Sequence, residues 1–256
     1  MFIKIFLIFF FVFSSVFAGT IDPQNSDKEY LEYGAKHTCV LPIMGFMADK
    51  LNNPFRGSCV LINENYALTA AHIVVNSMNQ FVVYENKPYP CSIVAIHALY
   101  DNTVFGKHDI AVVRLQRPIK LDFYPELYTS RDEHKKICSI AGFGFSGTFK
   151  TGSQTNKFDN KRRAGSNIIY DIEDNILICS TVDTPVTSLE FLICSGDSGG
   201  GLFIDQKLAG INSCVFSKDG NANSDYGDIS GHTRISDYHI WIKNTINSIE
   251  QLMLKP

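Results

Sequence analysis

The chain contains one glycine-rich segment around a serine: Cys194-Ser195-Gly196-Asp197-Ser198-Gly199-Gly200-Gly201. Glycine allows a backbone to approach a bound molecule closely or to adopt a positive φ, so a serine among glycines is well placed to meet a substrate. A serine hydroxyl is a weak nucleophile until a base takes its proton. A catalytic role for this serine therefore requires a base and an orienting carboxylate elsewhere in the chain.

Two upstream segments supply such groups, Thr69-Ala70-Ala71-His72 and His108-Asp109-Ile110-Ala111-Val112. His72 follows a β-like run that ends in small residues, which leaves room for an imidazole at a strand end. Asp109 precedes an apolar, strand-like run. The order histidine, aspartate, serine is that of chymotrypsin and differs from the orders in subtilisin and the α/β-hydrolases. The three segments resemble the trypsin/chymotrypsin family of serine proteases.

The resemblance implies a role for each of these residues. Ser198 would be the nucleophile, His72 the general base, and Asp109 the buried carboxylate that orients the histidine. Histidine has an unperturbed pKa of about 6.5, which suits a base at neutral pH. The backbone N–H groups of Gly196 and Ser198 would form the oxyanion hole, which stabilises the charge that develops on the substrate carbonyl oxygen.

Three further positions match the substrate-binding segments of the family. Ser213 matches the serine of a strand-like segment that pairs with the substrate backbone and lies near the catalytic aspartate, and Cys214 replaces the tryptophan after it. Leu192 stands six residues before the nucleophile, where trypsin-like pockets carry aspartate, so we expect an apolar or mixed pocket without a strong preference for Lys or Arg. One inserted residue would shift the count and bring Glu190 or Phe191 into play. His232 aligns near the pocket base and would favour acidic side chains.

Residues 1–18 read as a secretory signal peptide. Lys4 gives a positive n-region, Ile5–Phe13 an apolar run, and Val16-Phe17-Ala18 a small-residue cleavage site before Gly19. The apolar run is too short to span a bilayer, which needs about 20 residues. We therefore expect a secreted or otherwise exported protein, extracellular or periplasmic, without membrane association after the signal is cleaved.

The resemblance also raises the question of activation. In the family, a freed Ile or Val N-terminus pairs with the aspartate that precedes the nucleophile, here Asp197. The sequence has no Arg/Lys-Ile-Val-Gly-Gly motif, and Ile21 is the nearby candidate. We expect either trimming to Ile21 or a different cation from within the chain beside Asp197.

Export makes the cysteines candidates for disulfide bonds. There are seven, at positions 39, 59, 91, 138, 179, 194 and 214. An odd number leaves at least one outside any intrachain pair. Ile73 stands where the family has a cysteine after the catalytic histidine, and the usual partner of Cys138 falls at Ile204, so the connectivity cannot be copied from the family. No Cys/His spacing suggests zinc, and we expect no metal and no other cofactor.

The composition is that of an ordinary globular protein, with 45% hydrophobic and 19% charged residues. A net charge of −3 gives no electrostatic reason to expect a nucleic acid or an anionic membrane as partner. The expected partner is a protein or peptide substrate, and we expect a monomer.

From His37 onward, short apolar runs of strand length alternate with turns, which is typical of barrels or sandwiches. Joined to the resemblance, this predicts an all-β fold of two packed antiparallel six-stranded β-barrels with a C-terminal α-helix. Gly142–Gly165 is expected to be a long loop and Gly19–Lys36 an N-terminal arm. The predicted divisions after the signal peptide are one peptidase domain at 19–256, with barrels at about 37–128 and 136–236 and the helix, capped by Asp237, at about 237–253.

We interpret the chain as a secreted serine endopeptidase that works through an acyl-enzyme intermediate. A protease-like binding protein that has lost activity is the alternative, although its usual mark is a missing triad residue, and none is missing here. An esterase or lipase would share the G-x-S-x-G pattern but would carry its histidine after the serine. The triad-like partners of Ser198 are upstream, which disfavours that fold.

Overall fold

The computed structural model describes most of the chain from Gly19 onward. The described ranges are 19–48, 50–104, 106–154, 159–181, 185–217 and 219–254. The signal-peptide prediction falls on residues 1–18 and lies outside the described residues.

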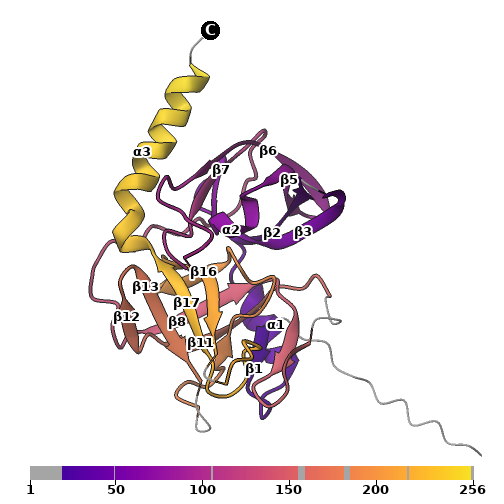
Figure 1. Cartoon of the computed structure of the whole chain (residues 1–256), viewed down its shortest axis with the longest axis vertical. Coiled ribbons are helices and arrows are strands. Elements are labelled where there is room, and N and C mark those ends of the chain that lie inside the picture. The colour runs from indigo at the N-terminus through magenta and orange to yellow at the C-terminus, as the bar shows by residue number, and fades with distance from the viewer. Residues whose placement is uncertain are drawn as a thin grey trace, which may run out of the picture.

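A closed six-stranded barrel forms the first half of the fold, with strand order β2-β3-β4-β7-β6-β5 (Figure 1). The strands are β2 Val40–Met47, β3 Lys50–Leu61, β4 Tyr66–Thr69, β5 Ser77–Tyr84, β6 Lys87–Ile96 and β7 Ala111–Leu115. A short helix, α2 (Ala71–Val74), follows β4. Aliphatic side chains such as Val60, Leu68 and Val112 are fully buried, as expected of strands rich in β-formers that close around a core.

A seven-stranded sheet forms the second half, with strand order β11-β8-β15-β16-β17-β13-β12. The strands are β8 Ile137–Gly142, β11 Arg163–Ile168, β12 Asp171–Glu173, β13 Ile176–Ser180, β15 Gly201–Ile204, β16 Lys207–Phe216 and β17 Ile229–Arg234. The predicted fold class is confirmed. In detail, the second half is an open half-barrel and not a closed six-stranded one, because β11 and β12 end the sheet as edges.

A small four-stranded sheet, β10-β9-β1-β14, corrects two predictions. Its strands are β1 Gly19–Ile21, β9 Ser146–Thr148, β10 Gly152–Gln154 and β14 Phe191–Leu192. The N-terminal segment is therefore not a free arm, because β1 pairs with β9 and β14 and is followed by helix α1 (Asp27–Ala35). The Gly142–Gly165 segment is likewise not one long loop, because it contains β9 and β10.

The start of α1 is marked by a capping interaction. The Ser26 N–H donates to the Glu29 carboxylate at 2.9 Å.

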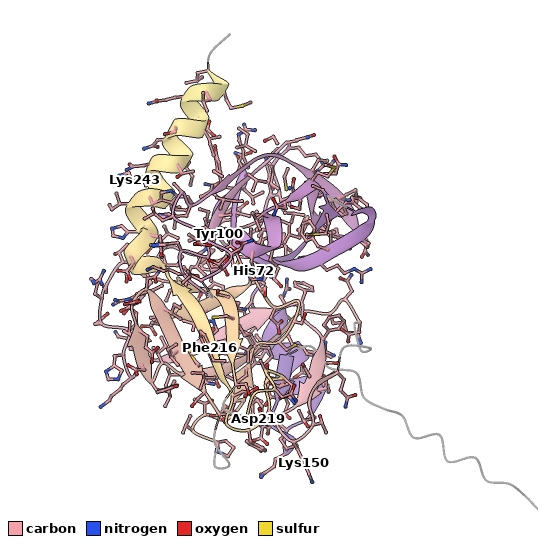
Figure 2. All side chains as sticks on the ribbon, in the orientation of Figure 1. His72, Tyr100, Lys150, Phe216, Asp219 and Lys243 are labelled. Carbon is pink, nitrogen blue, oxygen red and sulfur yellow. The ribbon has the colours of Figure 1, made fainter. Side chains whose placement is uncertain are left out.

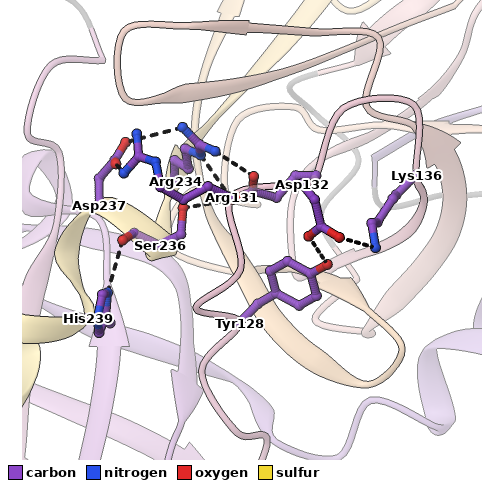
Figure 3. A network of polar contacts seen from close by, with 9 residues as sticks. Tyr128, Arg131, Asp132, Lys136, Arg234, Ser236, Asp237 and His239 are labelled. Atoms are coloured by element: carbon purple, nitrogen blue, oxygen red, sulfur yellow. Dashed lines mark hydrogen bonds and ion pairs between the residues drawn. The ribbon is translucent and has the colours of Figure 1, made fainter.

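The C-terminal helix α3 (Ile235–Met253) runs alongside the first barrel (Figure 1). It begins at Ile235, two residues before the predicted start at Asp237, and its N-cap residue is Arg234. Arg234 is held by the buried Glu133 carboxylate, which accepts a hydrogen bond from Nε at 2.9 Å and another from the Ser236 hydroxyl at 2.7 Å. Asp237 instead pairs with Arg131 in the linker between the halves (Figure 3).

None of the helices in the described part of the chain combines the length and the apolar character that crossing a bilayer would require.

Candidate active site

A cavity of about 340 Å³ lies between the two halves of the fold. Figure 2 shows His72 and Tyr100 close together at this boundary. The cavity is lined by His72, Tyr100, Asn102, Val104, Gly106, Asp109, Ile193, Cys194, Ser195, Ser198, Ser213, Cys214, Val215 and Ala222. The structure thus brings His72, Asp109 and Ser198 to one cavity, together with two of the three predicted substrate-binding residues.

The first barrel sets His72 beside Asp109 through its strand register. β4 and β7 are antiparallel neighbours, and Thr69 at the end of β4 pairs with Ala111 at the start of β7. The residues just beyond these ends are therefore adjacent. The Asp109 carboxylate accepts a hydrogen bond from His72 Nδ1 at 2.7 Å and one from the His72 backbone N–H at 2.9 Å.

Asp109 is almost completely buried, whereas the His72 side chain remains 38% exposed toward the cavity. The Ser213 hydroxyl donates to the same carboxylate oxygen at 2.6 Å, and the Thr233 hydroxyl donates to the Asp109 carbonyl at 2.9 Å. Burial raises the pKa of Asp109, but the hydrogen bonds from His72 and Ser213 outweigh it, so the pKa lies below its usual value. Asp109 therefore remains a carboxylate at neutral pH and fixes the ring of His72.

The loop between β14 and β15 presents Ser198, and the first barrel holds this loop in place. The Ser58 N–H donates to the Ser198 carbonyl at 2.8 Å, and the Ser58 hydroxyl donates to the Gly196 carbonyl at 3.0 Å. Gly199 has φ +82°, and a Cβ there would lie 2.1 Å from the Ser58 carbonyl oxygen. Only glycine fits such a position. Ser58 was missed by the sequence reasoning, because it lies in an unremarkable strand of the other half.

The loop that carries Ser198 contains the two backbone donors predicted to form an oxyanion hole. Within the described residues, the N–H groups of Gly196 and Ser198 have no hydrogen-bond partner. Gly196 has φ +95°, and a Cβ there would lie 2.9 Å from the Gly144 Cα, so the turn requires glycine. The arrangement leaves both donors available to an anionic oxygen.

Asp197 points away from the cavity into the protein. Its carboxylate accepts hydrogen bonds from the Gly144 N–H at 2.8 Å and the Cys194 N–H at 2.9 Å. Burial is the largest influence and raises the pKa of Asp197 to about 6. Among the described residues, no side-chain cation forms an ion pair with it.

Comparison with known proteins decides the family. The family model described as "Trypsin" matches residues 40–242, most of the chain. The chain belongs to the trypsin family. Beta-fibrinogenase brevinase of Gloydius blomhoffii is 26% identical over 227 residues, which are 78% of this chain and 90% of that relative. The predicted resemblance to trypsin/chymotrypsin-like serine proteases is confirmed.

Two solved structures share the fold of this chain. Neuropsin, a serine protease expressed in the limbic system of mouse brain, superposes with a TM-score of 0.64 at 22% identity, covering 83% of this chain and 96% of neuropsin. HL collagenase gives a TM-score of 0.67 at 18% identity, covering 84% of this chain and 95% of the collagenase. At these identities the likeness concerns the fold alone.

Two pocket residues suggested by alignment with the trypsin family lie outside the cavity. Leu192 is fully buried and pairs with Thr20 across strands β14 and β1, so Ile193, the next residue, is the one that reaches the cavity wall. His232 is buried between Asn212, which its Nδ1 contacts at 2.9 Å, and Ser230. Burial lowers the pKa of His232 to about 3, so the ring is neutral and offers no charge to an acidic side chain.

The seven cysteines are all free thiols in this structure, so the disulfides expected from export are not formed in it. The family disulfide beside the catalytic histidine is replaced by packing. Ile73 lies against Gly57, where a Cβ would be 2.1 Å from the Ile73 Cδ1. In the described residues, no three His, Cys, Asp or Glu side chains gather into a cluster that could hold a metal ion.

Proposed function

We propose that this trypsin-family protein is a secreted serine endopeptidase that cleaves peptide bonds through Ser198, His72 and Asp109. The observation that carries the proposal is the buried Asp109 carboxylate, which holds His72 by two hydrogen bonds in the cavity that Ser198 also lines. A retained binding function would not require this arrangement.

In the proposed mechanism, Ser198 Oγ attacks the carbonyl carbon of the scissile bond while His72 Nε2 takes the hydroxyl proton. Asp109 keeps the other ring proton on Nδ1 and stabilises the imidazolium that forms. The imidazolium then gives its proton to the leaving amine, which departs and leaves an acyl-enzyme. Water, activated by His72, hydrolyses the ester and restores Ser198.

The backbone N–H groups of Gly196 and Ser198 are proposed to bind the oxyanion of the tetrahedral intermediate. Loss of one such donor costs about 2.7–4 kcal/mol of transition-state stabilisation in comparable sites. Ser58 supports this role from the first barrel, because its hydrogen bonds fix the carbonyls of both Gly196 and Ser198.

The proposed substrates carry an apolar residue before the scissile bond. The cavity wall includes Ile193, Cys214, Val215 and Ala222, which offer no charge. Among the described lining residues the one carboxylate is Asp109, and it is already bonded to His72. A Lys or Arg side chain would lose its hydration without gaining a counter-ion, which is unfavourable.

A fluorophosphonate label followed by peptide mapping tests the proposal. The expected result is modification of Ser198 and of no other serine, with Ser195, which lines the same cavity, as the internal control. Ser198→Ala should abolish labelling and lower kcat on the order of a millionfold while leaving substrate binding largely intact. Absence of labelling in folded mature protein would favour the alternative, a catalytically silent binding protein.

A further inference from the structure

Two cysteines meet in the core of the second half of the fold. Cys138 lies on β8 and Cys179 on β13, and their sulfur atoms are 3.8 Å apart. Both side chains are buried in one apolar cluster with Ile140, Leu177 and Ile204. Ile204 is the residue that occupies the position of the usual partner of Cys138, so the partner that Cys138 meets here comes from a different strand.

The two cysteines are not on neighbouring strands. In the order β11-β8-β15-β16-β17-β13-β12, three strands separate β8 from β13. The contact between the sulfurs therefore crosses the interior of the curled sheet and does not run along a hydrogen-bonded ladder. A covalent bond at this point would close the open half-barrel through its core.

The thiol contact needs only a modest movement to become a bond. A disulfide has sulfurs about 2.05 Å apart, and rotation about the two Cα–Cβ bonds moves the sulfurs more than any other atoms of the pair. Burial, and then the contact with Cys138, raise the pKa of the Cys179 thiol well above its usual value. Since the thiolate is the reactive form, oxidation of the finished fold is slow, and the pair is most easily oxidised while the sheet is still forming.

We propose that Cys138 and Cys179 form an intrachain disulfide in the exported protein, which joins β8 to β13. The two thiols lose two electrons and two protons as the S–S bond forms. The oxidant is a low-molecular-weight disulfide, which is reduced to two thiols by thiol–disulfide exchange. The bond lies outside the catalytic cavity and does not rest on the proposed activity.

The link closes the chain between residues 138 and 179 and reduces the conformational freedom of the unfolded state. For a loop of this size in a chain of this length, the expected gain is a rise in Tm on the order of 10 °C. The bond also anchors β8, whose last residue, Gly142, lies against the Asp197 carboxylate.

Peptide mapping under non-reducing conditions tests the proposal. The full chain carrying Ser198→Ala, which cannot digest itself, is exported into an oxidising compartment or refolded with reduced and oxidised glutathione, then quenched in acid and alkylated. Cleavage after glutamate isolates each cysteine, because Glu133, Glu173 and Glu190 bound the peptides 134–173 and 174–190. The expected product is these two peptides joined by a disulfide and separated by reduction.

Thermal unfolding with and without a reductant supplies the second measurement. The oxidised protein should lose on the order of 10 °C in Tm on reduction. Cys179→Ala should remove this dependence, whereas Cys59→Ala, at an equally buried thiol of the first barrel, should retain it. Recovery of both peptides as alkylated free thiols, or of Cys138 bonded to any other cysteine, would overturn the proposal.

Discussion

The N-terminus of the mature protein is expected to complete the active site. Gly19 would be the first residue after signal cleavage, and its backbone N–H donates to the Phe145 carbonyl at 2.7 Å. Burial raises the pKa of the Cys194 thiol well above its usual value, and the backbone N–H of Gly19 opposes that rise, so it lies close to the sulfur. The Cys194 sulfur in turn lies 3.5 Å from the Asp197 carboxylate. Cleavage before Gly19 would therefore create an ammonium group near a buried carboxylate. Ile21, whose release by trimming is one of the two possibilities expected from the sequence, is the last residue of β1 and is buried.

The size of the effect follows from the Asp197 pKa. Burial raises it from 3.8 to about 6, which at 1.36 kcal/mol per unit is a cost of about 3 kcal/mol for keeping the charge at pH 7. Because the folded-state pKa is raised, this cost is absent below about pH 4 and grows as the pH rises through about 6. An ammonium at Gly19 would offset it. That benefit would be lost again as the amine deprotonates at alkaline pH, above its ordinary pKa of about 8.

Two proteins make the comparison, one that begins at Gly19 and one that retains Ala18. The expected result is that the first is more stable toward urea by about 3 kcal/mol at pH 7, with the difference shrinking toward zero near pH 4. Peptidase activity should follow the same order at pH 7. Asp197→Asn is the control, since both starts should then behave alike. Equal stability and equal activity of the two proteins at pH 7 would refute the reasoning.

Three substitutions test the rest of the site. Asp109→Asn should lower kcat roughly 10⁴-fold in steady-state assays, because the amide favours the wrong tautomer of His72. A fall in kcat of less than tenfold would contradict this role of Asp109. Gly199→Ala should destabilise the fold by about 3 kcal/mol or more in urea unfolding, because its Cβ would lie 2.1 Å from the Ser58 carbonyl oxygen. Val215→Gly should enlarge the cavity and move the preference in a peptide-library digest toward larger apolar residues, and an unchanged profile would remove Val215 from the specificity wall.

The sequence was sufficient to single out the candidate catalytic segments, because each has a local signature. Small residues precede His72, a strand-like apolar run follows Asp109, and glycines flank Ser198. The four-stranded sheet was not predictable in this way. Strands β1 and β9 are three residues long, and their stability comes from pairing with segments distant in the chain, which leaves no periodic pattern in either. The start of α1 did have a local signal, Ser26 followed three residues later by Glu29.

The pocket wall shows why counting along the chain is insufficient. Leu192 and Ile193 are both apolar and adjacent, and successive residues of an extended chain point in opposite directions. Leu192 pairs with Thr20 in the four-stranded sheet, which leaves Ile193 to face the cavity. That pairing depends on the position of β1. Because the sequence did not predict β1, it could not show that Ile193 and not Leu192 lines the cavity.

Contacts between the two halves of the fold set the geometry of the candidate site. Ser58 of the first barrel bonds the carbonyls of Gly196 and Ser198, while Thr233 of the second half bonds the Asp109 carbonyl at 2.9 Å. Each half therefore fixes the backbone of a functional residue carried by the other. Neither half alone holds both the proposed base and the proposed nucleophile in place, so the proposed catalytic arrangement depends on the docking of the two halves. A substitution that weakens the contacts between the halves should consequently lower kcat even where the packing around His72 is unchanged.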